Sequence, residues 1–516
     1  MDCESSRHDD SGRSTPQPQA MPTPRPSAII LSPTCRQYST YSKNKCECVQ
    51  VVWAVCVAGA GCALGAVLAF PALVMDTWTN NTDVDLSRTH ARWFGSVAQL
   101  ASIPGSILGG YLMDATGPRR LLLLLLPVLA VSWFLLLLTT HHPVLLIALR
   151  ALQGILTSWC SVSVYVYPCE VSEASRRGML DALPDVAFSM GYLLTFLLGA
   201  LIHWSTLVLL IPTCIFLPCI TAVITVPESP RWLLQTGRLE EARLVLQRGR
   251  TTECNIENEL IMMKERVNNQ ALKWRPGCQG TLLGKPKFLL PLLAAVMLVI
   301  FKECTGQITV TLFVVRLYSL MNTGIPPIWS SIIVCTAHVI SNLISCLLLN
   351  YMPHRSLLSS ASAIAGLTMA VNAFYFLKAD SRTSQEWVPL LCLLVFVVAY
   401  GSGIGPVARL MATELLPRPV QGLGSGFSTA FVCIIQFGLA YLTVNADDFP
   451  MHICFFSYSA GCFILAGFTL LLPETQSLNL EEKEQYWEDF TSQLILTRYW
   501  SCSILKVKSF TEDNQH

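Results

Sequence analysis

Charged residues are scarce in this sequence: Asp, Glu, Lys and Arg make up 13% of its 516 residues, whereas soluble globular proteins carry roughly 25%. Hydrophobic residues make up 52%, and the mean hydropathy is +0.48. Neither sign of charge is in excess, because the formal net charge is +1. Such a chain lacks the basic surface of a nucleic-acid-binding protein. At this length, the composition predicts a polytopic membrane protein that binds no nucleic acid.

The sequence also lacks the patterns of an enzyme. It shows no spacing typical of metal ligands and no pattern that pairs a nucleophile with a base. The glycine-rich stretch GSGIG at 401–405 follows no predicted strand, so a phosphate-binding loop is not expected there. We expect that stretch to pack and bend a helix instead. The prediction is therefore no catalytic residues, no metal and no cofactor.

Apolar runs that could cross a bilayer recur about twelve times along the chain. Each span needs about 20 apolar residues to form a helix across the hydrocarbon core. The expected spans are 49–75, 92–114, 120–140, 143–167, 179–202, 204–226, 288–320, 328–350, 356–377, 387–413, 427–445 and 451–472. This pattern predicts an all-α membrane protein.

Lys and Arg gather in alternate loops between these spans. The basic loops hold Arg119 and Arg120, Arg176 and Arg177, eleven basic residues between 231 and 287, Arg355, and Arg418. Since cytoplasmic loops carry more Lys and Arg, both termini are predicted to be cytosolic, in a multi-pass protein of the plasma membrane. The sequence Asn80-Asn81-Thr82 then falls in the first outside loop, where Asn80 is either glycosylated or an unused acceptor.

A long polar segment divides the spans into six and six, and its sequence predicts short amphipathic helices. The expected domains are a disordered cytosolic tail over 1–47, a six-helix bundle over 48–226, a cytosolic linker over 227–287, a second six-helix bundle over 288–473, and a cytosolic tail over 474–516.

Two motifs occur at equivalent positions in both halves. The sixth span ends in PESPR, with Glu228 and Arg231, and the twelfth ends in PETQ, with Glu474. The fourth span ends at Glu170 and the tenth at Glu414. Repeated motifs at matching places indicate two similar bundles, as in many secondary transporters.

Several longer motifs give a specific resemblance. They are GGYLMDATGPRR, RALQG, EVSEASRRGML, PESPRWLLQTGRLEEA, GSGIGPV, ELLP and PETQSLNLEE. Over roughly residues 48–485 the chain resembles the sugar porter family of the major facilitator superfamily, in its facilitated trehalose transporter-like branch, close to the facilitative glucose transporters. The resemblance implies the major facilitator fold, with about twelve transmembrane helices in two six-helix halves and short cytosolic helices between them.

The resemblance also implies a cytosolic latch of charged residues at helix ends. The expected members are Asp114, Arg119, Arg150, Glu170, Arg177, Glu228, Arg231, Arg355, Glu414 and Glu474. Charges that pair when this side is closed and separate when it opens would shift the equilibrium between the two conformations of the transporter. The alternative is that they only solvate the membrane interface. In the second half the latch is expected to be weaker, because Asn350, Pro353 and His354 depart from the family pattern.

Charged residues stand where the family places neutral groups that contact a sugar. By resemblance, two adjacent Gln on the seventh span correspond to Lys302 and Glu303, in the stretch that also holds Gln307. A Gln on the fifth span corresponds to Asp185, and a Trp on the tenth to Arg409. We expect these five residues to line a substrate pathway.

The cost of burying these charges supports their pairing. One charge at mid-membrane costs about 2.5–3.5 kcal/mol on insertion scales. Two acids and two bases, Asp185 and Glu303 with Lys302 and Arg409, can balance one another. The alternative to a substrate pathway is a fixed network of ion pairs that packs the two halves together.

The function predicted from these features is a secondary transporter in the lipid bilayer that moves a small polar solute by alternating access. We expect it to be a monomer. By resemblance the solute is a sugar, trehalose or a hexose. Two alternatives stay open. The solute could be charged or zwitterionic, or the chain could be a non-transporting sensor or receptor that keeps the fold.

Overall fold

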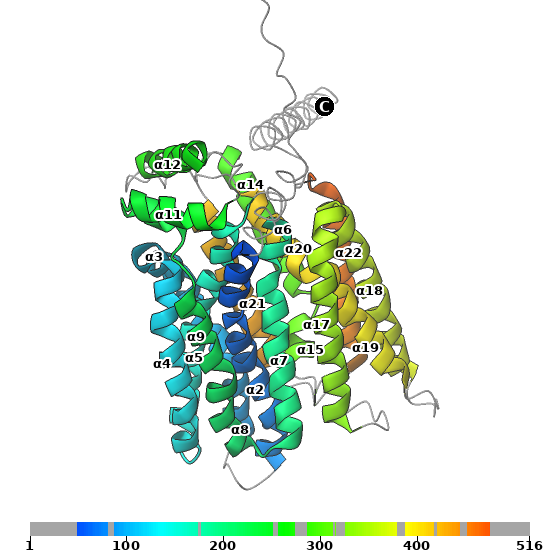
Figure 1. Ribbon diagram of the computed structural model, residues 1–516. Helices are drawn as coiled ribbons and strands as arrows, with labels where there is room; N and C mark the ends of the chain where they lie inside the picture. The colour runs from blue at the N-terminus through cyan, green and yellow to red at the C-terminus, as the bar shows by residue number, and fades with distance from the viewer. Residues whose placement is uncertain are drawn as a thin grey trace, which may run out of the picture.

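The computed structural model describes residues 49–80, 87–173, 177–250, 256–273, 286–312, 315, 326–378, 387–416, 421–443 and 451–474. Every regular element in these ranges is a helix (Figure 1). The predicted tail over 1–47 lies outside the described residues, and so does the predicted C-terminal tail beyond Glu474.

The first part of the chain forms α2 to α9. The bounds are α2 (Ala60–Asn80), α3 (Arg88–Thr116), α4 (Pro118–Thr139), α5 (Pro143–Val171), α6 (Arg177–Asp181), α7 (Leu183–Leu201), α8 (Trp204–Ile211), the π-helical turn η1 (Pro212–Phe216) and α9 (Leu217–Thr225). Residues 49–58, which precede α2, are also helical.

The later part forms the remaining elements. The bounds are α10 (Pro230–Gln235), α11 (Leu239–Gly249), α12 (Ile256–Lys273), α14 (Pro286–Glu303), α15 (Gln307–Leu312), α17 (Pro327–Tyr351), α18 (His354–Lys378), α19 (Trp387–Ala399), the π-helical turn η2 (Tyr400–Ile404), α20 (Gly405–Leu415), α21 (Gln421–Thr443) and α22 (Met451–Leu471).

Ten helices in the described ranges are long and apolar enough to cross a membrane. They coincide with ten of the twelve spans expected from the sequence. The other two expected spans correspond to α3, a helix of 29 residues that starts with polar side chains, and to α21, whose apolar part is the shorter stretch Gly426–Leu442. The prediction of an all-α membrane protein is confirmed.

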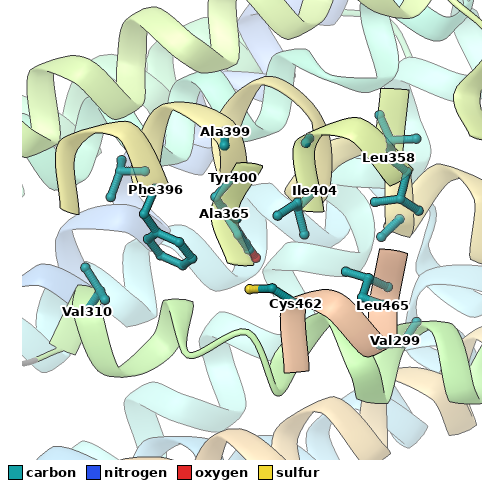
Figure 2. Close-up of a cluster of buried hydrophobic side chains, with 14 of the residues drawn as sticks. Val299, Val310, Leu358, Ala365, Phe396, Ala399, Tyr400, Ile404, Cys462 and Leu465 are labelled. Carbon is teal, nitrogen blue, oxygen red and sulfur yellow. The ribbon is translucent and has the colours of Figure 1, made fainter. Parts of the chain in front are cut away.

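Two large apolar cores lie inside the bundle. One is built mainly from α2 to α9 and includes Trp78 and Trp133. The other is built mainly from α14 to α22, and takes in Tyr192 and Phe196 of α7 as well. Figure 2 shows part of this second core, with Val299 and Val310 from the seventh span, Leu358 and Ala365 from α18, Phe396, Tyr400 and Ile404 from the tenth span, and Cys462 and Leu465 from α22.

The seventh span is broken between α14 and α15, directly after the charged pair that the sequence singles out. Gly306 has a φ of 85°, which side chains rarely adopt. A Cβ atom there would also lie 2.5 Å from the Tyr458 ring on α22. Glycine is therefore required at this break, which ends α14 at Glu303.

The short helices α11 and α12 lie together at one end of the bundle (Figure 1, top), and α10 packs against both. They share a small apolar core that includes Trp232, Leu246 and Leu260. We call this end of the bundle the linker face. The sequence predicts short amphipathic helices in this segment, and α11 and α12 confirm them.

Candidate functional site

An ion pair connects two helices that are far apart in the sequence. A guanidinium nitrogen of Arg409, on α20, donates to Oδ2 of Asp185, on α7. Tyr165, on α5, contacts both partners: its hydroxyl donates to Asp185 Oδ1 at 3.0 Å, and its ring lies 4.2 Å from the Arg409 guanidinium carbon. We call this group the Asp185–Arg409 bridge. It ties the first part of the chain to the second through charge and a cation–π contact.

The local sequence explains how Asp185 is held. It lies in the first turn of α7, which begins with Leu183 and Pro184, and a negative charge is favourable at a helix N-terminus. Asn342, on α17, donates through Nδ2 to the Asp185 backbone carbonyl at 3.2 Å and to Ser189 Oγ at 3.1 Å. The start of α7 is thus fixed against a helix of the second core.

A second ion pair lies at the end of α14. Lys302 Nζ donates to Glu303 Oε1 at 2.6 Å, and Gln436 Nε2, on α21, donates to Glu303 Oε2 at 3.0 Å. The Glu303 side chain is 3% exposed and that of Lys302 17%. Both carboxylate oxygens of Glu303 are therefore occupied, and the charge is almost completely enclosed.

The two ion pairs lie near each other inside the bundle, since Lys302 is close enough to Arg409 for their charges to interact. The Tyr400 side chain lies close enough to the charges of both ion pairs to interact with them electrostatically. The four charges thus form two ion pairs that lie close to each other.

Gln307, the fifth expected pathway residue, starts α15 just beyond the glycine break. Its Nε2 donates to Thr311 Oγ1 at 3.1 Å. Within the described residues its Oε1 atom is buried and has no hydrogen-bond partner. The neighbouring Thr309 hydroxyl lies 2.9 Å from the hydroxyl of Tyr458.

At the linker face, Glu228 binds the start of α4. Its carboxylate accepts hydrogen bonds from the backbone N–H groups of Arg119 at 3.0 Å and Arg120 at 3.3 Å. The Arg119 guanidinium donates in turn to the carbonyls of Val223 and Ile224, in the last turn of α9. A carboxylate at a helix N-terminus and a guanidinium at a C-terminus both satisfy backbone groups that lack intrahelical partners.

Glu170 and Arg231 form the second part of the same network. Their side chains lie 3.4 Å apart, and Ser229 Oγ donates to the other oxygen of Glu170 at 2.5 Å. Arg231 also lies near enough to Asp114 for their charges to interact. Trp232 Nε1 donates to the Asp114 backbone carbonyl at 2.9 Å, so α10 is joined to α3 as well as α5.

The later part of the chain repeats this geometry. Glu474 accepts from the backbone N–H groups of His354 at 3.0 Å and Arg355 at 3.1 Å, at the start of α18. The Arg355 guanidinium contacts the Leu470 carbonyl in the last turn of α22. His354 Nδ1 lies 3.6 Å from Glu414 Oε2. The second half therefore keeps the capping carboxylate, whereas a histidine faces the acid that ends the tenth span.

Arg150 does not belong to this network, and its sequence-based assignment to the latch is wrong. Arg150 lies twenty residues, or about 30 Å, from Glu170 along α5, near the end opposite the linker face. It is 1% exposed, donates to Gln153 Oε1 at 3.0 Å and packs 5.8 Å from the Phe94 ring. Among the described residues its Nε and second amino nitrogen have no hydrogen-bond partner.

Two further predicted residues cannot be placed by their contacts. The side chain of Arg177, the first residue of α6, lies outside the described part of the structure. The same holds for the side chain of Asn80, the last residue of α2.

Gln436 and Tyr165 contact the two ion pairs, although the sequence analysis did not predict either residue. The only signal for Gln436 is a lone amide within an apolar run, one turn beyond Cys433.

The arrangement of helices matches solved transporters of the major facilitator superfamily. The proton:xylose symporter XylE bound to 6-bromo-6-deoxy-D-glucose superposes with a TM-score of 0.71 at 19% identity, covering 85% of this chain and 99% of that one. The inward-open form of XylE from E. coli gives a TM-score of 0.67 at 20% identity, covering 84% and 99%. The chain therefore has the major facilitator fold, as predicted.

Sequence comparison then defines the family. Residues 28–487 match the model of the family described as sugar (and other) transporter, and the chain belongs to this family. It is 29% identical over 448 residues to the facilitated trehalose transporter Tret1 of Drosophila erecta, covering 84% of this chain and 51% of that protein. Tret1 of Bombyx mori is 27% identical over 413 residues, covering 79% and 81%. The chain spans about half the length of the Drosophila relatives it matches.

Proposed function

We propose that this protein is a secondary transporter that moves a small polar solute across a membrane by alternating access. Family membership and the fold support this proposal, and the Asp185–Arg409 bridge carries it. The bridge joins α7 to α20 inside the bundle, next to a phenol and within reach of a second ion pair. Intramembrane charges of this kind are expensive to bury and typically mark solute or ion pathways.

The two parts of the chain move against each other in this proposal. Residues 48–226 and 288–473 form the two bundles, and 227–287 links them. Opening the linker face separates α7 from α20, so the bridge forms and breaks during each cycle. The contacts of Glu170, Arg231 and Asp114, with the caps at Glu228 and Glu474, hold the helix ends of each bundle together while it moves.

The nature of the solute is the finer part of the proposal. Relatives named as trehalose transporters favour a sugar, trehalose or a hexose, as the first candidate. The second candidate is a charged or zwitterionic solute, and it is favoured by the charges of Asp185, Arg409, Lys302 and Glu303 where uncharged groups would serve a sugar. A sensor that binds a solute without moving it is the alternative of another class.

Uptake by the purified full-length protein in proteoliposomes tests this function. Radiolabelled neutral, anionic, cationic and zwitterionic solutes are loaded in turn, with empty liposomes as control. We expect saturable uptake and counterflow of at least one solute. A protein that is stabilised by a solute but gives neither uptake nor counterflow of it is a sensor, and the transporter proposal is then wrong.

We also propose that the protein works as a monomer in the plasma membrane, with both termini and the linker face in the cytosol. Single cysteines placed at Thr82 and Glu257, in a variant without other reactive thiols, test this orientation. Glu257 lies on α12 and is exposed. Impermeant reagents added outside intact cells should label the cysteine at Thr82 and spare that at Glu257. The reverse pattern contradicts the orientation.

A further inference from the structure

We propose that the solute is a zwitterion, whose carboxylate takes the place of Asp185 on Arg409 and whose ammonium group takes the place of Arg409 on Asp185. The bridge would then be both the binding site and the contact that the solute opens. This inference rests on the proposed transport function and names the chemical class of its solute.

Each partner of the bridge keeps a support of its own when the other leaves. Tyr165 donates its hydroxyl to one oxygen of Asp185, and the same ring lies under the Arg409 guanidinium. The Asp185 backbone is held separately by Asn342. The two charged groups therefore form two half-sites that are already positioned side by side, one for a cation and one for an anion.

The exposure of Arg409 and the enclosure of Glu303 distinguish the Asp185–Arg409 bridge from the Lys302–Glu303 pair. Arg409 is 32% exposed and Asp185 16%, although their contact lies between helices of the two parts of the chain. Glu303, in contrast, is enclosed and has both oxygens occupied by Lys302 and Gln436. A solute can therefore reach Arg409 with less desolvation than Glu303, and the Lys302–Glu303 pair serves as a fixed ion pair.

The balance of charge selects the class of solute. A sugar offers only neutral dipoles, so separating Asp185 from Arg409 around it leaves two poorly compensated charges in a low-dielectric site. A simple anion satisfies Arg409 and strands Asp185, and a simple cation does the opposite. A zwitterion replaces each partner in kind, so the bridge opens without leaving either charge unpaired.

This exchange links binding to the conformational cycle. A solute shifts a two-state equilibrium only by its difference in affinity for the two states. The zwitterion gains both of its ionic contacts only when the bridge is open, and so it favours the state in which α7 and α20 are apart. Without solute, Asp185 and Arg409 bind each other and hold α7 and α20 together.

The test uses matched solutes on the reconstituted full-length protein. A panel of α-, β- and γ-amino acids is compared with trehalose and glucose. For each amino acid that is transported, the hydroxy acid of the same skeleton lacks the ammonium group, and the amino amide lacks the carboxylate. We expect at least one zwitterion to be transported, with both analogues and both sugars at least tenfold weaker as competitors.

Variants of the bridge locate the effect. Arg409→Gln and Asp185→Asn should each weaken zwitterion uptake at least tenfold, and Arg409→Lys should retain part of it. Glu240→Gln, an exposed change on α11, is the control and should leave uptake unchanged. If the variants unfold, the matched solutes on the natural protein still decide the question.

The outcomes separate the two proposals. Uptake of a sugar without uptake of any zwitterion overturns the zwitterion inference and leaves the transporter proposal standing. Zwitterion uptake that is unaffected by both bridge variants overturns the assignment of the site. A folded protein that transports no member of the panel contradicts both proposals.

Discussion

Glu228 and Glu474 hold equivalent positions in the two parts of the chain. Each carboxylate accepts two backbone hydrogen bonds at the start of a long helix, from Arg119 and Arg120 in one case and from His354 and Arg355 in the other. Each helix start is followed by an arginine that reaches the last carbonyls of the helix before the glutamate. Both parts of the chain therefore use the same arrangement, a glutamate that caps one helix and an arginine that binds the end of another, at the linker face.

Replacing Glu228 by Gln should destabilise the protein by about 0.5–2 kcal/mol, the usual value of a helix N-terminal cap. The amide keeps the shape but loses the charge and one acceptor oxygen. Thermal unfolding in detergent measures the effect. Glu240→Gln, exposed on α11, should change stability by less than about 0.5 kcal/mol. Equal effects of the two changes would remove Glu228 from this role.

Gly306→Ala should destabilise the protein strongly, because the backbone has a positive φ and the new Cβ would overlap the Tyr458 ring. Strain of this kind costs about 1–3 kcal/mol. The matched control is Gly467→Ala on α22, where a Cβ meets no atom within 4 Å and removing a helical glycine stabilises by about 0.5–1 kcal/mol. Melting temperatures that move in the same direction for both would contradict the proposed break.

Lys302→Gln alone should cost more stability than Lys302→Gln combined with Glu303→Gln. The single change leaves the enclosed Glu303 carboxylate without its counterion, which costs about 3–5 kcal/mol in buried pairs. The double change removes both charges, and Gln436 can still donate to an amide oxygen. Melting temperatures and the yield of monodisperse protein give the comparison. A double variant less stable than the single one would show that the pair is not coupled.

Arg150→Met should raise the melting temperature. Arg150 is fully enclosed and, among the described residues, two of its nitrogens lack acceptors. Enclosing a charge costs several kcal/mol of desolvation, and Met removes that cost while keeping a side chain of similar length. Arg231→Met, a change to an ion-paired residue at the linker face, serves as the comparison and should not stabilise. A fall in melting temperature for Arg150→Met would indicate that the guanidinium has a compensating partner.

The sequence predicts the membrane spans well because each rests on a composition of some 20 residues. It also predicts that Asp185 and Arg409 belong to one region, since the family resemblance assigns both to positions that contact the substrate. The prediction that Arg150 belongs to the latch failed because a short motif does not show at which end of its helix it lies. Arg150 and Glu170 are on the same helix, α5, but about 30 Å apart along it. The cap formed by Glu228 involves backbone N–H groups, which leave no mark in the sequence, and Gln436 meets Glu303 only through packing of α21 on α14.

The most direct test of the account is a double-mutant cycle on the Asp185–Arg409 bridge. The unfolding free energy is measured for the natural protein, Asp185→Asn, Arg409→Gln and the double variant. We predict a coupling energy of about 0.5–3 kcal/mol, the range found for residues in direct contact, with the double variant losing less stability than the sum of the two single losses. Strictly additive effects would show that Asp185 and Arg409 do not form one unit, and would contradict the account.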